Sequence, residues 1–239
     1  MAKSKNSQVL LPRDEKPSDL LKEVKRFRPI NHSQEILEQY IENKDVIFVT
    51  GAAGVGKTYA ALWIALNIIK DKTNHYEKLL LSKSAVQIKG EEIGFIPGDI
   101  AEKLDPIMYS FTANIDKITG LNGSAKKMQE KNLIEWKPIA FLRGCQFDNS
   151  IVILDEAQNL NIHAIKTILT RLGKTSKLII MGDLEQYDRN PNSSASGFEI
   201  AKNIIGNTKY SGCVDFLDSE CVRNPIITDI VKKLRENGF

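Results

Sequence analysis

An eight-residue segment, Gly51–Thr58, limits what this chain can fold into more than any other feature. Its sequence, GAAGVGKT, fits the pattern G-x-x-x-x-G-K-[S/T], with an apolar stretch at 45–50 before it and another from 57 to about 70 after it. Pattern and flanks together predict a strand, a phosphate-binding loop and a helix. Glycines let successive backbone N–H groups turn toward phosphates, and the helix N-terminus adds a favourable dipole.

The loop therefore predicts the binding of a nucleotide with magnesium. Lys57 would reach the β- and γ-phosphates, and the Thr58 hydroxyl would bind the ion. The predicted phosphate-binding residues are Gly51, Ala52, Ala53, Gly54, Val55, Gly56, Lys57 and Thr58.

Two adjacent carboxylates follow a second apolar run. Ile151–Leu154 reads as a buried strand, and Asp155 and Glu156 come directly after it. Ligands of open α/β sheets bind at the carboxyl ends of the strands. Asp155 would hold magnesium, and Glu156 would orient and deprotonate the attacking water. The structural alternative is a helix-capping pair, because Asp and Glu also favour helix N-termini.

A third strand end carries Gly182, Asp183 and Gln186 after the apolar run 177–181. The Gln186 amide at that edge would contact the γ-phosphate or the lytic water and report hydrolysis. The alternative is an ordinary Gly-Asp turn.

Phosphoryl transfer commonly requires a guanidinium, supplied by the same chain or by a neighbour. Spacing does not choose among the candidates, and each has a surface or salt-bridge role as its alternative. The candidates are Arg143, Arg171, Arg189 and Arg223.

Strands and helices alternate from about residue 31 onward. Apolar runs predict strands at 45–50, 78–82, 151–154, 177–181 and 213–217, and helices near 33–43, 57–70, 98–111, 162–172 and 225–235. Continuous apolar strands between helices predict one α/β domain, at 30–239, with a mainly parallel sheet covered by helices on both faces. Residues 1–29 are charged and contain three prolines. We expect them to form a flexible arm and not a core element.

Composition excludes several classes of protein. Lys and Arg total 33 and Asp and Glu total 30, so any basic surface is local. The cluster Lys126, Lys127 and Lys131 would either touch a nucleic-acid backbone or form a solvated face. Three separated cysteines and three histidines without ligand spacing predict neither zinc nor disulfides, which fits a reducing, cytoplasmic setting. No apolar run approaches the roughly 18 to 20 residues of a membrane span.

With these motifs in order, the chain resembles the PhoH family of P-loop ATPases, which are related to superfamily 1 helicases. The resemblance covers about residues 30–234. Beyond the phosphate loop it rests on segments 89–99 (KGEEIGFIPGD), 138–144 (PIAFLRG), 152–159 (VILDEAQN), 169–171 (LTR) and 182–183. The GEEIGFIPGD block is far more specific than the loop.

The resemblance implies a RecA-like P-loop NTPase domain and a role for each motif. Lys57 and Thr58 bind phosphate and magnesium, Asp155 and Glu156 form the hydrolytic pair, and Gln186 senses the γ-phosphate. It also implies that Gln34 contacts adenine. Two departures stand out: Lys83-Ser84 replaces the family's usual Arg-Pro, which puts a nucleic-acid contact from that loop in doubt, and Arg223-Asn224 replaces Arg-His but keeps the arginine.

Superfamily 1 helicases close ATP between two RecA-like lobes, whereas residues 30–239 hold one set of motifs. A neighbouring copy would complete the site with an arginine, Arg143 as first choice and Arg223 as second. Head-to-tail contacts that close give rings, so we expect a homo-oligomeric ring, a hexamer by preference. Many family members carry an added nuclease or RNA-binding domain, and a short stand-alone form resembles those of bacteriophages.

The sequence-based interpretation is thus a magnesium-dependent ATPase that couples hydrolysis to translocation on, or remodelling of, single-stranded RNA or DNA. One alternative is a nucleotide-gated binding module with slow hydrolysis that recruits a host protein, in the phosphate-stress setting that the family name suggests. A small-molecule kinase is disfavoured, because Glu156 is placed to activate water and no lid for an acceptor is recognisable.

Overall fold

The computed structural model describes residues 17–84, 100–144, 146–184 and 196–220, together with residues 230 and 233. Six strands form one sheet in the order β3-β2-β4-β5-β1-β6, and each pairing between them is parallel. The strands are β1 Val46–Thr50, β2 Lys78–Lys83, β3 Ile134–Trp136, β4 Ser150–Asp155, β5 Lys177–Gly182 and β6 Ser211–Asp215.

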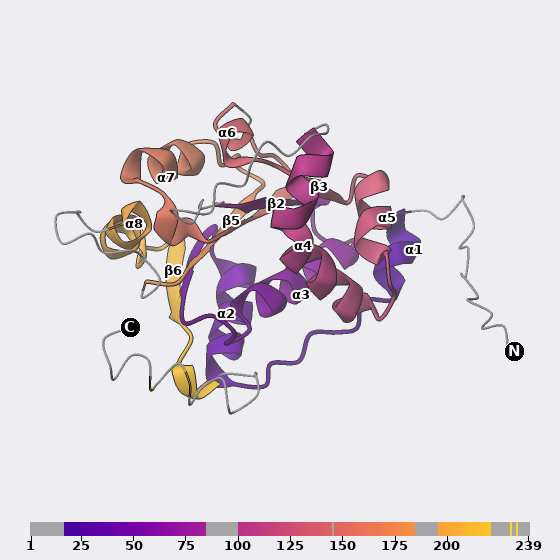
Figure 1. The fold of residues 1–239 in the computed structure, drawn as a ribbon, viewed down its shortest axis with the longest axis horizontal. Coiled ribbons are helices and arrows are strands. Elements are labelled where there is room, and N and C mark those ends of the chain that lie inside the picture. Colours follow the sequence, from indigo (N-terminus) through magenta and orange to yellow (C-terminus); the bar gives the residue numbers. More distant parts are fainter. Residues whose placement is uncertain are drawn as a thin grey trace, which may run out of the picture.

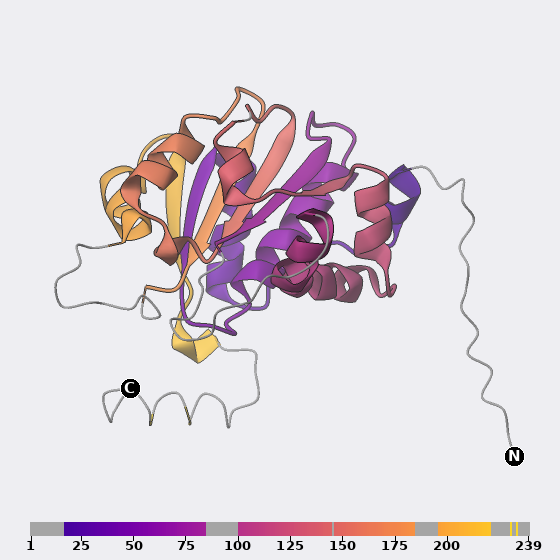
Figure 2. The same cartoon turned by 45° about the horizontal axis from the view of Figure 1, so that its top comes forward.

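Helices cover both faces of this sheet (Figures 1 and 2). They are α1 Pro17–Lys22, α2 His32–Asn43, α3 Lys57–Lys70, α4 Ile100–Thr119, α5 Ser124–Glu130, α6 Ile139–Leu142, α7 Ile162–Leu169 and α8 Gly197–Ile205, with 3-10 turns η1 Ala157–Asn159 and η2 Asp218–Glu220. Within the described ranges, no helix combines the length and apolar character that a membrane crossing requires.

The apolar strands are buried on both sides. Along β4, Ile151 and Ile153 pack into the core under α3 and α4, whereas Val152 and Leu154 pack into the core under α7 and α8. Alternate side chains of a strand point to opposite faces, so a run that is apolar throughout suits a sheet covered on both faces. The predicted fold, a single RecA-like P-loop domain with a parallel sheet between helices, is confirmed.

Strand order brings three predicted motifs to one edge. Strand β5 lies between β1 and β4, so the phosphate loop after β1, Gly182–Asp183 after β5 and Asp155–Glu156 after β4 are neighbours. This edge is the carboxyl end of the parallel sheet, where ligands of such folds bind.

Residues 120–131, for which the sequence predicts no helix, contain helix α5. Asp116 on α4 organises it: the carboxylate accepts hydrogen bonds from the backbone N–H groups of Gly123 (2.7 Å) and Ala125 (2.9 Å) and from the Ser124 hydroxyl (2.8 Å). Ala125 and Met128 are then buried against the core. The added strand β3 follows this helix.

The prediction of a flexible arm over residues 1–29 is wrong for residues 17–29. Helix α1 forms there, and four apolar side chains enter the core on the α3 side: Leu20, Leu21, Val24 and Phe27. Their spacing buries one face of the segment. Residues 1–16 lie outside the described ranges, as does most of the predicted helix 225–235.

Polar side chains of α3 hold this segment in place. Trp63 Nε1 donates to the Lys25 carbonyl (2.7 Å), and Lys70 Nζ donates to the Val24 carbonyl (2.7 Å). Asn67 uses both ends of its amide: Nδ2 donates to the Lys25 carbonyl (3.0 Å), and Oδ1 accepts from the Phe27 N–H (3.3 Å).

Replacing Asn67 with alanine is expected to destabilise the fold by about 2 kcal/mol, because two hydrogen bonds to the 25–27 backbone are lost, the one from the Phe27 N–H partly buried and the one to the Lys25 carbonyl exposed. Urea unfolding followed by circular dichroism measures the change. Asn43→Ala is the matched control, since its exposed amide contacts only the preceding helical turn. Equal midpoints for the two variants would show that α3 does not anchor this segment.

Candidate nucleotide-binding site

The phosphate loop makes a tight turn between β1 and α3 that depends on glycine. Gly51, Gly54 and Gly56 have φ angles of 143°, 91° and 91°, a region that other residues rarely adopt. At Gly51 there is also no room, because a Cβ would lie 2.8 Å from Cβ of Phe216. The loop therefore has the backbone conformation that lets it wrap closely around a ligand.

Lys57, the first residue of α3, folds back over this loop. Its ammonium donates to the carbonyls of Gly51 (2.5 Å) and Ala52 (2.8 Å), and the side chain is nearly buried. The positive charge is thus held at the mouth of the loop, where phosphate oxygens would arrive.

Thr58 and Asp155 meet beside the loop. The Thr58 hydroxyl donates to Oδ2 of Asp155 at 3.1 Å, although 97 residues separate them in sequence. Burial raises the pKa of the Asp155 carboxyl and the nearby Glu156 raises it further, while Lys83, the Glu156 N–H and Thr58 act in the opposite direction. A hydroxyl and a buried carboxylate are the hard oxygen ligands that magnesium prefers, so this pair fits the ion.

Glu156 has an unusual backbone. Its φ of 56° lies in the left-handed region, which for a non-glycine residue costs on the order of 1 kcal/mol and is typical of functional sites. Although it stands before η1, its side chain makes no capping hydrogen bond. The helix-capping alternative for Glu156 is therefore not supported. Instead, one carboxylate oxygen accepts from Gln158 (2.7 Å), and the other lies 3.7 Å from Lys83 Nζ.

Gln158 joins two of the strand ends. Its side chain is buried, its Nε2 donates to Glu156, and its Oε1 accepts from the backbone N–H of Asp183 at 3.1 Å. The carboxylate after β4 is thereby held relative to the end of β5. Sequence reasoning placed Gln158 in a family motif but gave it no role.

For the ATP hydrolysis that we propose below, replacing Gln158 with leucine is expected to lower turnover about tenfold at unchanged ATP affinity. Glu156 loses its orienting donor and the Asp183 N–H loses its acceptor, a loss of about 1–3 kcal/mol. Steady-state phosphate release at saturating ATP measures the effect. Gln39→Leu, at an exposed position on α2, is the control. A turnover equal to that of the control would exclude this orienting role.

Lys57, Thr58, Asp155 and Glu156 line a single cavity of about 590 Å³. The lining comes from the loop and α3 (Ala53, Gly54, Gly56, Lys57, Thr58, Tyr59, Trp63), the strand ends (Lys83, Asp155, Glu156, Gly182, Asp183), segment 27–34 (Phe27, Arg28, Ile30, Gln34) and α4 (Ser110, Asn114, Lys117).

Gln34 lies at the end of the cavity formed by segment 27–34. It is buried near the start of α2, where its Oε1 accepts from the Ile30 N–H (3.1 Å) and its own N–H donates to Asn31 (2.9 Å). Edge-to-face contacts between Phe27, Trp63 and Tyr59 form an aromatic wall nearby. A planar, apolar base fits such a wall.

Residues 26–235 match the PhoH-like protein family. The chain belongs to this family. The PhoH-like protein of Bacillus subtilis (strain 168) is 35% identical over 192 residues, which are 80% of this chain and 59% of that protein. Protein PhoH of Escherichia coli K12 is 35% identical over 197 residues, 82% of this chain and 54% of its own length.

The PhoH-like domain described here is thus similar to a little over half of each of these relatives. Among solved structures, the Pif1 helicase from Candida albicans has 14% sequence identity and a TM-score of 0.39, covering 87% of this chain and 44% of the helicase. Loop, acidic pair and sheet order show that the PhoH-like domain has a P-loop NTPase fold.

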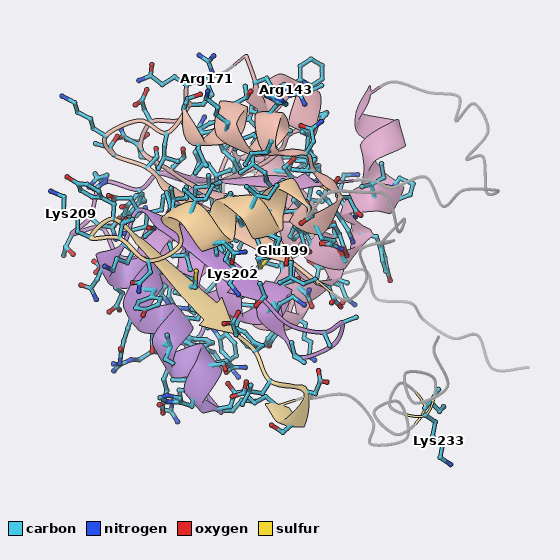
Figure 3. All side chains as sticks on the ribbon, turned by 90° about the vertical axis from the view of Figure 1, so that its left-hand side faces the viewer. Arg143, Arg171, Glu199, Lys202, Lys209 and Lys233 are labelled. Atoms are coloured by element: carbon cyan, nitrogen blue, oxygen red, sulfur yellow. The ribbon has the colours of Figure 1, made fainter. Side chains whose placement is uncertain are left out.

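The arginine predictions remain untested in this PhoH-like domain. Arg143 and Arg171 are exposed, and neither lines the cavity. Figure 3 shows both near α7, on the opposite side of α8 from β6. Gln186, Arg189 and Arg223 lie outside the described residues.

Three cations without a predicted role at the nucleotide also line the cavity: Arg28, Lys83, which the sequence marks only as a departure from the family pattern, and Lys117. Lys117 lies over the Tyr59 ring, 5.1 Å from its centroid. Each comes from a different element, so only the packing of segment 27–34, β2 and α4 around the loop brings them together.

Proposed function

We propose that this PhoH-like domain is a magnesium-dependent ATP hydrolase that couples turnover to movement along, or remodelling of, single-stranded RNA or DNA. The observation that carries the proposal is the convergence of Lys57, Thr58, Asp155 and Glu156 in one cavity. A phosphate loop alone supports nucleotide binding. A second carboxylate beside the magnesium ligand supports hydrolysis, because it supplies a base for water.

In the binding step, the triphosphate enters the glycine loop. Its oxygens replace the carbonyls of Gly51 and Ala52 as hydrogen-bond acceptors of the Lys57 ammonium. Gln34 and the aromatic wall receive the adenine. Thr58 and Asp155 would hold the magnesium ion. When bound, this ion neutralises charge on the β- and γ-phosphate oxygens.

In the chemical step, the Glu156 carboxylate accepts a proton from a water molecule whose oxygen attacks the γ-phosphorus. The bond between that phosphorus and the β,γ-bridging oxygen breaks, and ADP and inorganic phosphate leave. Gln158 keeps the carboxylate oriented while the proton moves. Gln186 would contact the γ-phosphate from the β5 side.

For charge on the transferred phosphoryl group, we propose an arginine from a neighbouring copy in a ring, which we expect to be hexameric. One set of motifs on one sheet supports this arrangement, as does the exposure of Arg143 on the surface. Arg223 is the second choice. Sedimentation velocity with and without ATP tests the ring: a particle that stays monomeric in both conditions would exclude it.

The experiment that tests the function is phosphate release from magnesium ATP, with and without single-stranded RNA or DNA, by the wild type and by Glu156→Gln. We expect turnover by the wild type, acceleration by a single strand, and loss of both in the variant. If neither protein releases phosphate under any condition, the hydrolytic assignment fails. A nucleotide-gated binding module would then be the better account.

A further inference from the structure

A second cavity, of about 340 Å³, lies over the carboxyl ends of β2 and β3. Its lining combines two lysines, Lys83 and Lys137, with mostly apolar side chains, among them Met108, Pro138 and Leu160. The nucleotide site makes no use of this cavity.

Lys83 connects the two cavities. Of the described residues, it alone lines both. It ends β2 opposite Asp155 in the parallel register, so its ammonium reaches across to 3.7 Å from Oε1 of Glu156 and 3.5 Å from the Ser110 hydroxyl. The contact with Glu156 is long for an ion pair, and it is made to the residue that activates water.

The chemistry of the second cavity fits a phosphodiester strand with unpaired bases. Two ammonium groups line it, and among the described lining residues there is no carboxylate. Glu135 holds Lys137 at 2.6 Å but also lies 3.5 Å from Lys78, so two lysines and one glutamate leave that group with a net charge of +1. Phosphates bind such cations, and unpaired bases cover apolar side chains.

We propose that a phosphate of single-stranded nucleic acid in this second cavity draws Lys83 away from Glu156 and so releases the carboxylate for hydrolysis. Lys83 is then a positioning residue: without a strand it holds Glu156, and with a strand it holds the strand. The proposal rests on the proposed ATPase function and explains how occupancy of one cavity changes the rate in the other.

The test compares Lys83→Met with Lys22→Met, a matched control on α1 whose lysine also pairs with a carboxylate, that of Asp19, and lines neither cavity. Phosphate release is measured with and without a single-stranded oligouridylate. For Lys83→Met we expect a basal rate about fivefold above wild type, as expected for removal of a restraint of about 1 kcal/mol, and no further stimulation by the strand. Lys22→Met is expected to match wild type in both conditions.

Binding is measured separately, without nucleotide, by the fluorescence anisotropy of a labelled oligouridylate. Lys83→Met and Lys137→Met are each expected to weaken binding and to reduce the slope of log affinity against log salt by about 0.7, the value for one phosphate contact on a single strand. Binding of a fluorescent ATP analogue to each variant shows that the variant is folded.

Several outcomes would overturn the proposal. If Lys83→Met has the same basal rate and the same stimulation by the strand as the wild type, Lys83 does not couple the two cavities. The proposed ATPase function would still stand, provided that the wild type hydrolyses ATP. A reduced basal rate with normal ATP binding would make Lys83 a cation of the nucleotide site. Equal stimulation of the wild type by a phosphorylated peptide would exclude nucleic acid as the specific occupant. A wild type without phosphate release would remove both proposals.

Discussion

Replacing Glu156 with glutamine is expected to lower ATP turnover by about 10²- to 10⁴-fold, the usual contribution of a general base, while ATP stays bound. The amide keeps the shape of the side chain and still accepts the hydrogen bond from Gln158. It cannot accept the proton from the attacking water. Loop contacts to the phosphates are untouched, so affinity for ATP is retained.

Single-turnover phosphate release and equilibrium binding of a fluorescent ATP analogue separate these two effects. Glu199→Gln is the matched control, because Glu199 lies on α8 (Figure 3) and is not among the residues that line the cavity. A Glu156→Gln turnover above one tenth of the wild-type rate would mean that another group deprotonates the water.

Replacing Lys57 with alanine is expected to weaken ATP binding about a hundredfold, since charge-assisted hydrogen bonds of this kind contribute about 3 kcal/mol. The ammonium is already in place: it is nearly buried and donates to two carbonyls of the loop. Its loss removes the cation that the phosphates would meet and leaves those carbonyls without their donor.

Isothermal titration with ATP and magnesium measures this loss, and Lys166→Ala, at an exposed position on α7, is the control. Thermal unfolding without nucleotide shows how much of the change comes from the loop itself. An unchanged dissociation constant for Lys57→Ala would show that the phosphates do not bind in this loop.

The parts of the site that sequence predicts are those that one segment specifies alone. The phosphate loop needs glycines and a lysine in fixed order between a strand and a helix. Asp155 and Glu156 need only a buried strand before them. Both features are contiguous in sequence, and the structure brings Lys57, Thr58 and the acidic pair into the same cavity.

The remaining parts depend on which strands are neighbours, and the spacing of motifs does not determine that. Lys83 reaches Glu156 only because β2 pairs with β4. Gln158 has a role only because β5 lies beside β4, which brings the Asp183 N–H within its reach.

Segment 17–29 differs from the predicted flexible arm for a related reason. Its charged residues and prolines suggest a solvated tail, whereas Trp63, Asn67 and Lys70 supply the hydrogen bonds that its backbone needs. These partners lie about 40 residues further along the chain.

The position of β1 in the sheet has a consequence for biosynthesis. This strand is made before both of its neighbours, β5 and β6, with Val46 paired to Leu178 on one side and to Ser211 on the other. During synthesis, about 130 residues must therefore be added after β1 before β5, the first of its two neighbouring strands, can pair with it. Contacts this distant in sequence favour slow folding, so nucleotide binding is expected to be among the last properties that the nascent chain acquires.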